Sequence, residues 1–266
     1  MNIFLRELRA NRRSTITWTV SLSTIVVVFM GLYPAFSADV DTTRELLAQF
    51  PEALRTALNL SLDNFFTIQG FFGYLLGFAV LAGGIQAMNL GTGIIAKEVS
   101  GKTADFLLSK PVTRSTVVTA KLAAALTILV ITNVAFALVS YLAARAMASE
   151  PFSARTFLLL ASTLFLVQLF FLALGSLFAV LLPKVKSVVS VSLPTVFAFY
   201  IVAAVGDVVA NEDVRYITPF KFFESDYIIA NNSLEGSSLA LLAGFVVVAI
   251  AASYVIYNRK DVRAAA

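Results

Sequence analysis

The segment whose spacing comes nearest to a known chemical motif is Ala96–Thr103, which reads Ala-Lys-Glu-Val-Ser-Gly-Lys-Thr. It ends in the Gly-Lys-Thr of a phosphate-binding loop, but Ala96 stands where that loop begins with glycine. Such a loop needs a buried strand before it and a helix after it inside a nucleotide-binding domain. Here a long apolar run leads into the segment and leaves no room for such a domain. We therefore expect no nucleotide to bind there.

Other reactive side chains are scarce in this sequence. It contains no cysteine and no histidine, which excludes thiol nucleophiles, thiolate metal sites, disulfides and the commonest general base. A serine protease acting within the membrane would need a histidine beside its serine, so Gly175-Ser176 is interpreted as a pair of small residues in a helix interface. The sequence predicts that the chain is not an enzyme and binds no metal or cofactor itself.

Hydropathy indicates which elements must hold the remaining polar residues. Apolar residues make up 59% of the chain and charged residues 14%, and the mean hydropathy is +0.85, values typical of integral membrane proteins. Six charge-free runs reach the length of about 20 residues that crosses a bilayer as a helix. We predict an all-α fold in which residues 1–266 form a single transmembrane domain, with approximate spans at 15–37, 68–96, 117–143, 156–182, 187–207 and 237–257.

The distribution of basic residues predicts the orientation. With the N-terminus inside, 14 of the 20 Lys and Arg residues fall on the cytoplasmic side, as the positive-inside rule requires. We expect a multi-pass protein of the cell (plasma) membrane with both termini in the cytoplasm, in a prokaryote. The basic charge therefore reports topology, and no nucleic-acid partner is expected because no basic patch alternates with exposed aromatic residues.

The segment before the first span has apolar and basic residues on different faces of a helix. Met1, Phe4, Leu5 and Leu8 form the apolar face, and Arg6, Arg9 and Arg13 form the basic one. This pattern predicts an N-terminal elbow helix in the cytoplasmic interface. The alternative is a short basic tail that only sets the orientation.

Two outer loops contain apolar residues. In the first, a stripe of Leu47, Phe50, Leu54 and Leu58 is broken by Pro51, which suggests two short amphipathic helices or an ordinary solvated loop. In the second, residues 207–235 mix charges with aromatic residues, which predicts structure that dips into the outer interface.

A few uncharged polar residues lie deep in the predicted spans, namely Gln86, Asn89, Asn133 and Gln168. Such residues line a pathway or, as we favour, form hydrogen bonds between helices. Pro194 removes a backbone hydrogen bond in the fifth span and predicts a kink that forms part of a gate.

The charged segment between the second and third spans predicts a compact cytoplasmic knob. Gly101 suits the end of the extended second helix, and Thr103 can cap a short new helix. Leu107 and Leu108 give that helix an apolar side, and Pro111 ends it. Apolar residues surrounded by charges make a small docking surface.

These residues resemble those that follow the second span in the membrane-spanning permease subunits of type-2 ATP-binding cassette (ABC) exporters. The matching positions are Glu98, Gly101 with Thr103, Leu107-Leu108-Ser109, Pro111, Arg114 and Lys121. Segments 216–223 and 257–262, on either side of the last span, are similar as well. Lys102, inserted between Gly101 and Thr103, departs from the family pattern.

The resemblance implies that the knob is a coupling helix, with Glu98 and Arg114 as polar contacts and Leu107 and Leu108 as the apolar anchor. It implies two ABC ATPase subunits, which hold ATP and Mg²⁺, on the cytoplasmic side. It also implies a second permease subunit, identical or different, that completes a translocation pathway within membrane lipid. The exported substrate would be a lipid, peptide, drug or other small molecule.

Two alternatives are an ion-gradient-driven secondary transporter and a non-transporting membrane scaffold. Secondary transporters usually place ionisable groups near the middle of the membrane, and the predicted spans have essentially none. Asp207 falls at the outer end of the fifth span. A scaffold would share the knob but would not show substrate-stimulated ATP hydrolysis by its partner.

Overall fold

The computed structural model describes residues 3–51, 54–55, 60, 64–99, 113–209 and 212–259. Within these residues, six helices are long and apolar enough to cross a membrane. They are α1 (Ile3–Met30) with its continuation α2 (Tyr33–Ser37), α5 (Ile68–Val99), α7 (Arg114–Met147), α8 (Ala154–Leu181), α9 (Val188–Val209) and α11 (Gly236–Arg259). The predicted all-α membrane fold with six spans is therefore confirmed. That the whole chain forms one domain stays a prediction.

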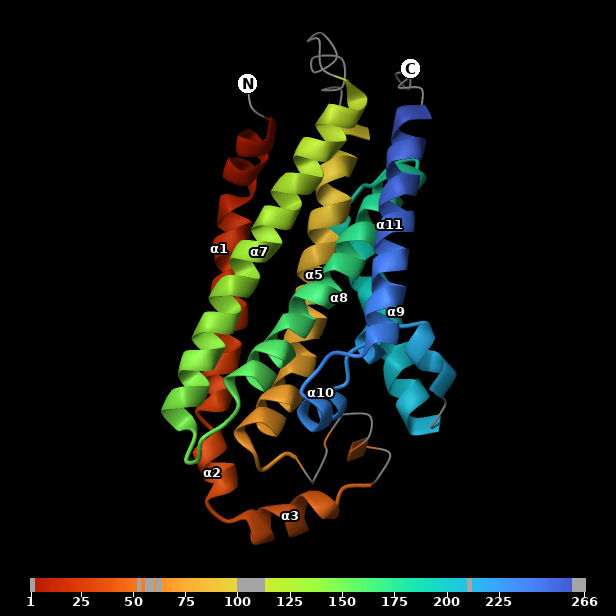
Figure 1. The fold of residues 1–266 in the computed structure, drawn as a ribbon. Coiled ribbons are helices and arrows are strands. Elements are labelled where there is room, and N and C mark those ends of the chain that lie inside the picture. The colour runs from red at the N-terminus through yellow and green to blue at the C-terminus, as the bar shows by residue number, and fades with distance from the viewer. Residues whose placement is uncertain are drawn as a thin grey trace.

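The long helices run along one common direction, and several of them begin or end together at each end of the bundle. Figure 1 shows the start of α1, the end of α5, the start of α7 and the end of α11 at one end of the bundle. This end, which we call the basic end, carries Arg6, Arg9, Arg13, Arg114 and Arg259. The opposite end, which we call the loop end, carries α2, α3 (Val40–Ala48) and α10 (Ser225–Asn231).

Two helices, α5 and α8, form the centre of the bundle and have the largest buried share of the six spans. Their backbones lie very close. A Cβ atom added to Gly91 would lie 2.4 Å from the carbonyl oxygen of Leu172, and one added to Gly175 would lie 2.7 Å from that of Met88. Glycine permits this approach, which strengthens van der Waals packing where lipid supplies no hydrophobic driving force.

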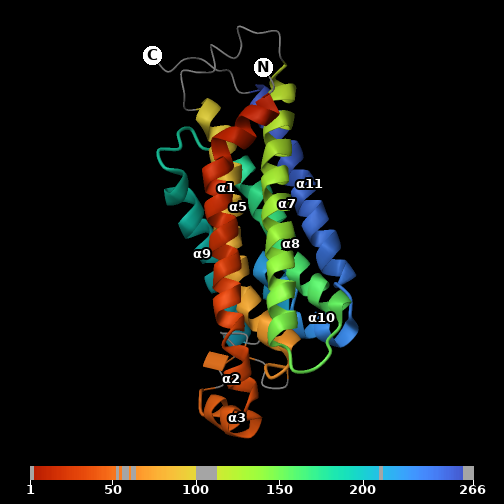
Figure 2. The same ribbon diagram turned by 90° about the vertical axis from the view of Figure 1, so that its left-hand side faces the viewer.

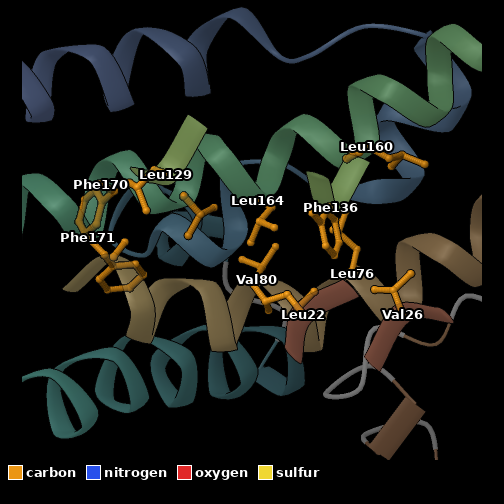
Figure 3. Close-up of a cluster of buried hydrophobic side chains, with 14 of the residues drawn as sticks. Leu22, Val26, Leu76, Val80, Leu129, Phe136, Leu160, Leu164, Phe170 and Phe171 are labelled. Carbon is orange, nitrogen blue, oxygen red and sulfur yellow. The ribbon is translucent and has the colours of Figure 1, made fainter. Parts of the chain in front are cut away.

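Large apolar side chains fill the space between α1, α5, α7 and α8. Figure 3 shows Leu22 of α1 beside Val80 of α5, with Leu164 of α8 above them and Val26 of α1 further along, on the side of Leu76. Towards the loop end, the ring of Phe72 in α5 stacks on Phe157 in α8 with their centroids 4.2 Å apart. The core is therefore a tightly packed layer in which side chains of all four helices interlock.

The elbow prediction falls on the first turns of α1. The structure has no separate element there, since α1 is continuous from Ile3 to Met30. Figure 2 shows these first turns leaning away from the axis of the rest of α1. Phe4 and Leu8 are partly buried and Arg6 and Arg9 are exposed, but Leu5, predicted on the apolar face, is exposed as well, so the division of faces is found only in part. A position in the membrane interface stays a prediction.

The first outer loop contains one of the two expected short helices. Its α3 begins after Asp39, whose carboxylate accepts a hydrogen bond from the backbone N–H of Thr42 at 3.1 Å, as an N-cap does. Leu47 lies in α3, whereas Leu58 and most of its neighbours lie outside the described residues.

The second outer loop folds back onto the bundle. It comprises η1 (Glu212–Tyr216), η2 (Pro219–Lys221) and α10. The hydroxyl of Thr218 donates to the carbonyl oxygen of Phe199 at 2.9 Å, and the side chains of Phe222 and Ile228 are buried. The aromatic residues noted in the sequence thus fix this loop to the spans.

Pro194 lies inside α9, and α9 is continuous through it from Val188 to Val209. The proline therefore does not break the helix. The hydroxyl of the next residue, Thr195, donates to the carbonyl oxygen of Val191 at 2.8 Å. A role for Pro194 in a gate stays a prediction.

The contact between α5 and α8 predicts different effects for two glycines of α5. Gly91→Ala should destabilise the protein by about 1–3 kcal/mol, because the new methyl group overlaps the backbone of α8. Gly93→Ala is the control, since its Cβ would lie 3.5 Å from the nearest Val188 atom, an ordinary contact. Thermal unfolding of the purified variants in detergent measures both, and equal midpoints would contradict the assigned helix contact.

Candidate functional site

The predicted coupling residues lie mostly in a part of the chain that the structure does not describe. Gly101, Thr103, Leu107, Leu108 and Pro111, and the side chain of Glu98, lie outside the described residues. The coupling knob therefore stays a prediction. The structure does describe the two helices that enter and leave it, α5 and α7, and the contacts that fix their ends.

The start of α7 is fixed to the end of α11. Thr113 caps α7, its hydroxyl accepting from the backbone N–H of Thr116 at 3.3 Å. The guanidinium of Arg114 donates to the carbonyl oxygen of Asn258 at 3.4 Å. One turn further on, the hydroxyls of Thr119 and Tyr254 lie 2.7 Å apart. Arg114, predicted as a coupling contact, thus lies at the junction of these two helices.

Lys121, the other coupling residue within the described part, lies inside the bundle. Its side chain is 3% exposed, and its Nζ lies 3.0 Å from Oε1 of Glu7 in α1 and 2.7 Å from the carbonyl oxygen of Ile94 in α5. One ammonium group thus connects α1, α5 and α7. The side chain is enclosed by its own chain, and the role of Lys121 in coupling stays a prediction.

Sequence reasoning missed the partner of Lys121. Glu7 lies among the arginines before the first span and was not predicted to have a partner, yet it is buried. The signal was present, because Glu7 is three residues after Phe4 and one before Leu8 and so lies beside the apolar face of the helix. Likewise Lys121 follows Val117 and Val118, which are buried, at helical spacing.

A second set of polar contacts lies in the middle of the bundle. The chain of contacts runs from Thr19 in α1 to Thr132 in α7, then to Gln86 in α5, Gln168 in α8 and Asn133 in α7. The distances in this order are 3.1, 3.2, 3.0 and 2.5 Å. We call these five residues the polar network. It contains no ionisable side chain and links four helices by hydrogen bonds.

Three of the four polar residues singled out in the sequence belong to the polar network, whereas Asn89 does not. Its Oδ1 atom is buried and has no hydrogen-bond partner among the described residues. The two threonines of the network were not predicted, because threonine is common in membrane helices and nothing in the local sequence distinguishes these two.

A third group of polar residues lies at the loop end, where η2 meets α9. Nζ of Lys221 lies 2.6 Å from Oδ1 of Asp207 and 2.8 Å from Oε1 of Glu224. Burial favours the neutral amine, but hydrogen bonds and charge attraction from the two carboxylates outweigh it, so the pKa of Lys221 is raised. Lys221 therefore stays protonated and joins the second outer loop to α9.

Comparison with known families gives a match that spans nearly the whole chain. A family model described as "ABC-2 family transporter protein" matches residues 1–262. No curated protein matches the chain. The match confirms the resemblance drawn from the segment between the second and third spans, and it identifies the chain as a membrane component of a transporter.

The buried ion pair leads to a prediction about stability. Lys121→Met should destabilise the protein by about 3–5 kcal/mol, because it leaves the carboxylate of Glu7 buried without a partner. Adding Glu7→Leu should restore most of the lost stability, since apolar residues of similar volume can replace a buried pair.

The control for this pair is Lys184→Met, which alters an exposed lysine and should leave the unfolding midpoint unchanged. Thermal unfolding in detergent compares the four proteins. If Lys121→Met unfolded at the same temperature as the Lys184 variant, the ion pair would not stabilise the bundle.

Proposed function

We propose that this chain, which belongs to the ABC-2 family of transporter proteins, is the permease subunit of an ATP-driven exporter. Two permease subunits, identical or different, would form the translocation pathway together. Two separate ABC ATPase subunits would bind ATP and Mg²⁺ and dock on the cytoplasmic side. The family match over residues 1–262 is the observation on which this proposal chiefly rests.

The orientation follows from charge. The basic end collects the exposed arginines of α1, together with Arg114 and Arg259, and such residues face the cytoplasm in membrane proteins. Both chain termini and the segment between α5 and α7 then lie on the side where ATP is available. In this proposal the protein lies in the plasma membrane with its loop end facing outwards, and the charge distribution supports that orientation.

The contacts at the basic end suggest how movement passes from the ATPase subunits to the spans. The segment between α5 and α7 begins and ends on helices that are fixed to the rest of the bundle. Lys121 ties α7 to α1 and α5, and Arg114 ties it to α11. When ATP draws the ATPase subunits together, a docked segment shifts these helices as a unit and changes the balance between two packings of the spans.

The polar network favours this mechanism over transport driven by an ion gradient. Gradient-driven carriers usually place ionisable groups near the membrane middle, where protons or ions bind. The five residues that connect the four central helices here are all uncharged. The buried charges of Glu7 and Lys121 lie instead at the basic end and neutralise each other.

The proposal is tested by purifying the tagged protein from its native membrane in mild detergent and measuring ATP hydrolysis. We expect an ABC ATPase to co-purify. Glu98→Ala combined with Leu107→Ala should reduce its binding at least about tenfold, because central docking residues each contribute about 2 kcal/mol or more.

The matched control is Glu45→Ala combined with Leu46→Ala, which removes an exposed acidic residue and an exposed leucine from α3 at the loop end. It should leave the bound ATPase unchanged. Recovery of the protein alone, with no ATPase and no hydrolysis, would contradict the proposal and favour a gradient-driven carrier or a scaffold.

A further inference from the structure

A cleft lies between α5 and α9 near the loop end, and η2 and the start of α10 cover its outer end. Its cavity volume is about 100 Å³. The α5 wall is formed by Tyr74, Gly77 and Phe78, and the α9 wall by Tyr200 and Ala204. The walls thus combine aromatic rings with small residues that leave space between the helices.

Gly77 marks where the packing of α5 opens. Other glycines of this helix lie tightly against neighbours: a Cβ added to Gly83 would lie 2.4 Å from Leu164, and one added to Gly91 would overlap the backbone of α8, whereas one added to Gly93 would make an ordinary contact. A Cβ added to Gly77 would meet no atom within 4 Å. The missing side chain therefore leaves unfilled space, and packing of this chain does not explain the glycine.

Charges gather at the outer end of the cleft. Asp207, Lys221 and Glu224 all line it, so two carboxylates face one ammonium group. The three charges sum to −1. Nζ of Lys221 contacts one carboxylate oxygen of Asp207 and one of Glu224. The side chain of Glu224 remains 53% exposed. The outer end can thus accept a further positive charge.

The aromatic walls suit the same kind of group. The rings of Tyr74 and Tyr200 border the cleft next to the charged end, and a cation over such a ring gains about 0.5–2 kcal/mol. Phe78 is 43% exposed and offers an apolar surface outside the cleft. A cavity of about 100 Å³ is somewhat smaller than a cavity of about 150 Å³ that holds benzene, so it fits a head group rather than a whole drug-sized molecule.

We propose that the cleft between α5 and α9 binds the cationic head of an amine-bearing amphiphile, with its alkyl tail extending along Phe78 into the membrane. The positive head lies against Glu224 and Asp207, and the first methylene groups fill the space above Gly77. This proposal deepens the proposed function by assigning the cargo a chemical class. Only the role of the cleft as a cargo site rests on the proposed function; the binding of the amine does not.

The test measures equilibrium binding of radiolabelled dodecylamine to the full chain in phosphatidylcholine nanodiscs, with empty nanodiscs as background. We expect saturable binding that unlabelled dodecylamine displaces and dodecyl sulfate does not. Gly77→Leu should weaken it at least about tenfold, because the leucine fills the cleft. Glu224→Gln should weaken it about fivefold and reduce the preference for the cation.

The chain provides a matched control in Gly244 of α11, where an added Cβ also meets no atom within 4 Å. Gly244→Leu should bind dodecylamine like the wild type. If Gly77→Leu does not give a monodisperse protein, Ala204→Leu fills the cleft from its other wall and should have the same effect.

Three results would overturn the proposal. The first is no saturable binding of dodecylamine to the wild type, and the second is binding to Gly77→Leu and Ala204→Leu that equals binding to the wild type. The third is displacement of the labelled amine by dodecyl sulfate as effectively as by unlabelled dodecylamine. A change in oligomeric state of the Gly77 variant with unchanged amine binding would assign the cleft to a contact between subunits. The assay contains no ATPase, so a lack of amine binding would leave the permease proposal intact. Likewise, a failure to co-purify an ATPase would leave the amine-binding result intact.

Discussion

The close backbone contact between α5 and α8 is the constraint on which the rest of the bundle depends. In lipid, helices gain little from hiding apolar surface, so their association rests on shape, and Gly91 and Gly175 allow the two backbones to meet. With this pair fixed, α1, α7, α9 and α11 pack around it. The rings of Phe170 in α8 and Phe245 in α11 stack with their centroids 4.0 Å apart and so attach α11 to this central pair.

Several polar groups buried in this environment find partners on other helices, and these contacts lie in two layers. The polar network joins α1, α5, α7 and α8 without charge, and Lys121 joins three helices at the basic end by satisfying both Glu7 and the carbonyl of Ile94. An unpaired amide or ion costs free energy in lipid, so each contact also specifies which helix faces fit together. The bundle is therefore held by matched polar pairs as well as by packed side chains.

Much of this fold follows from the sequence, because apolar runs of fixed length separated by charged segments determine the spans. Pairing across helices does not. Glu7 and Lys121 are 114 positions apart, and only their places on buried helix faces hint that they meet. The same holds for Thr19 and Thr132. Pro194 shows the opposite case, since a local rule predicts a kink or break and the helix remains continuous. The knob from Gly101 to Pro111 was predicted from local helix-end and capping patterns, and its coupling role from the family resemblance; these residues lie outside the described part of the chain.

One element, α5, contributes to the buried ion-pair site, the polar network and the cleft. Ile94 of α5 accepts from Lys121, Gln86 belongs to the polar network, and Gly77 borders the cleft. These residues span 17 positions, or about 25 Å of helix, which is most of the bilayer core. An α-helix in contact with α8 along its length cannot easily shorten or bend, so a displacement of its basic end must appear near the cleft. In the proposed transporter, α5 would therefore connect ATP-driven movement in the cytoplasm to the affinity of the cleft for its cargo, without any contact between the two sites.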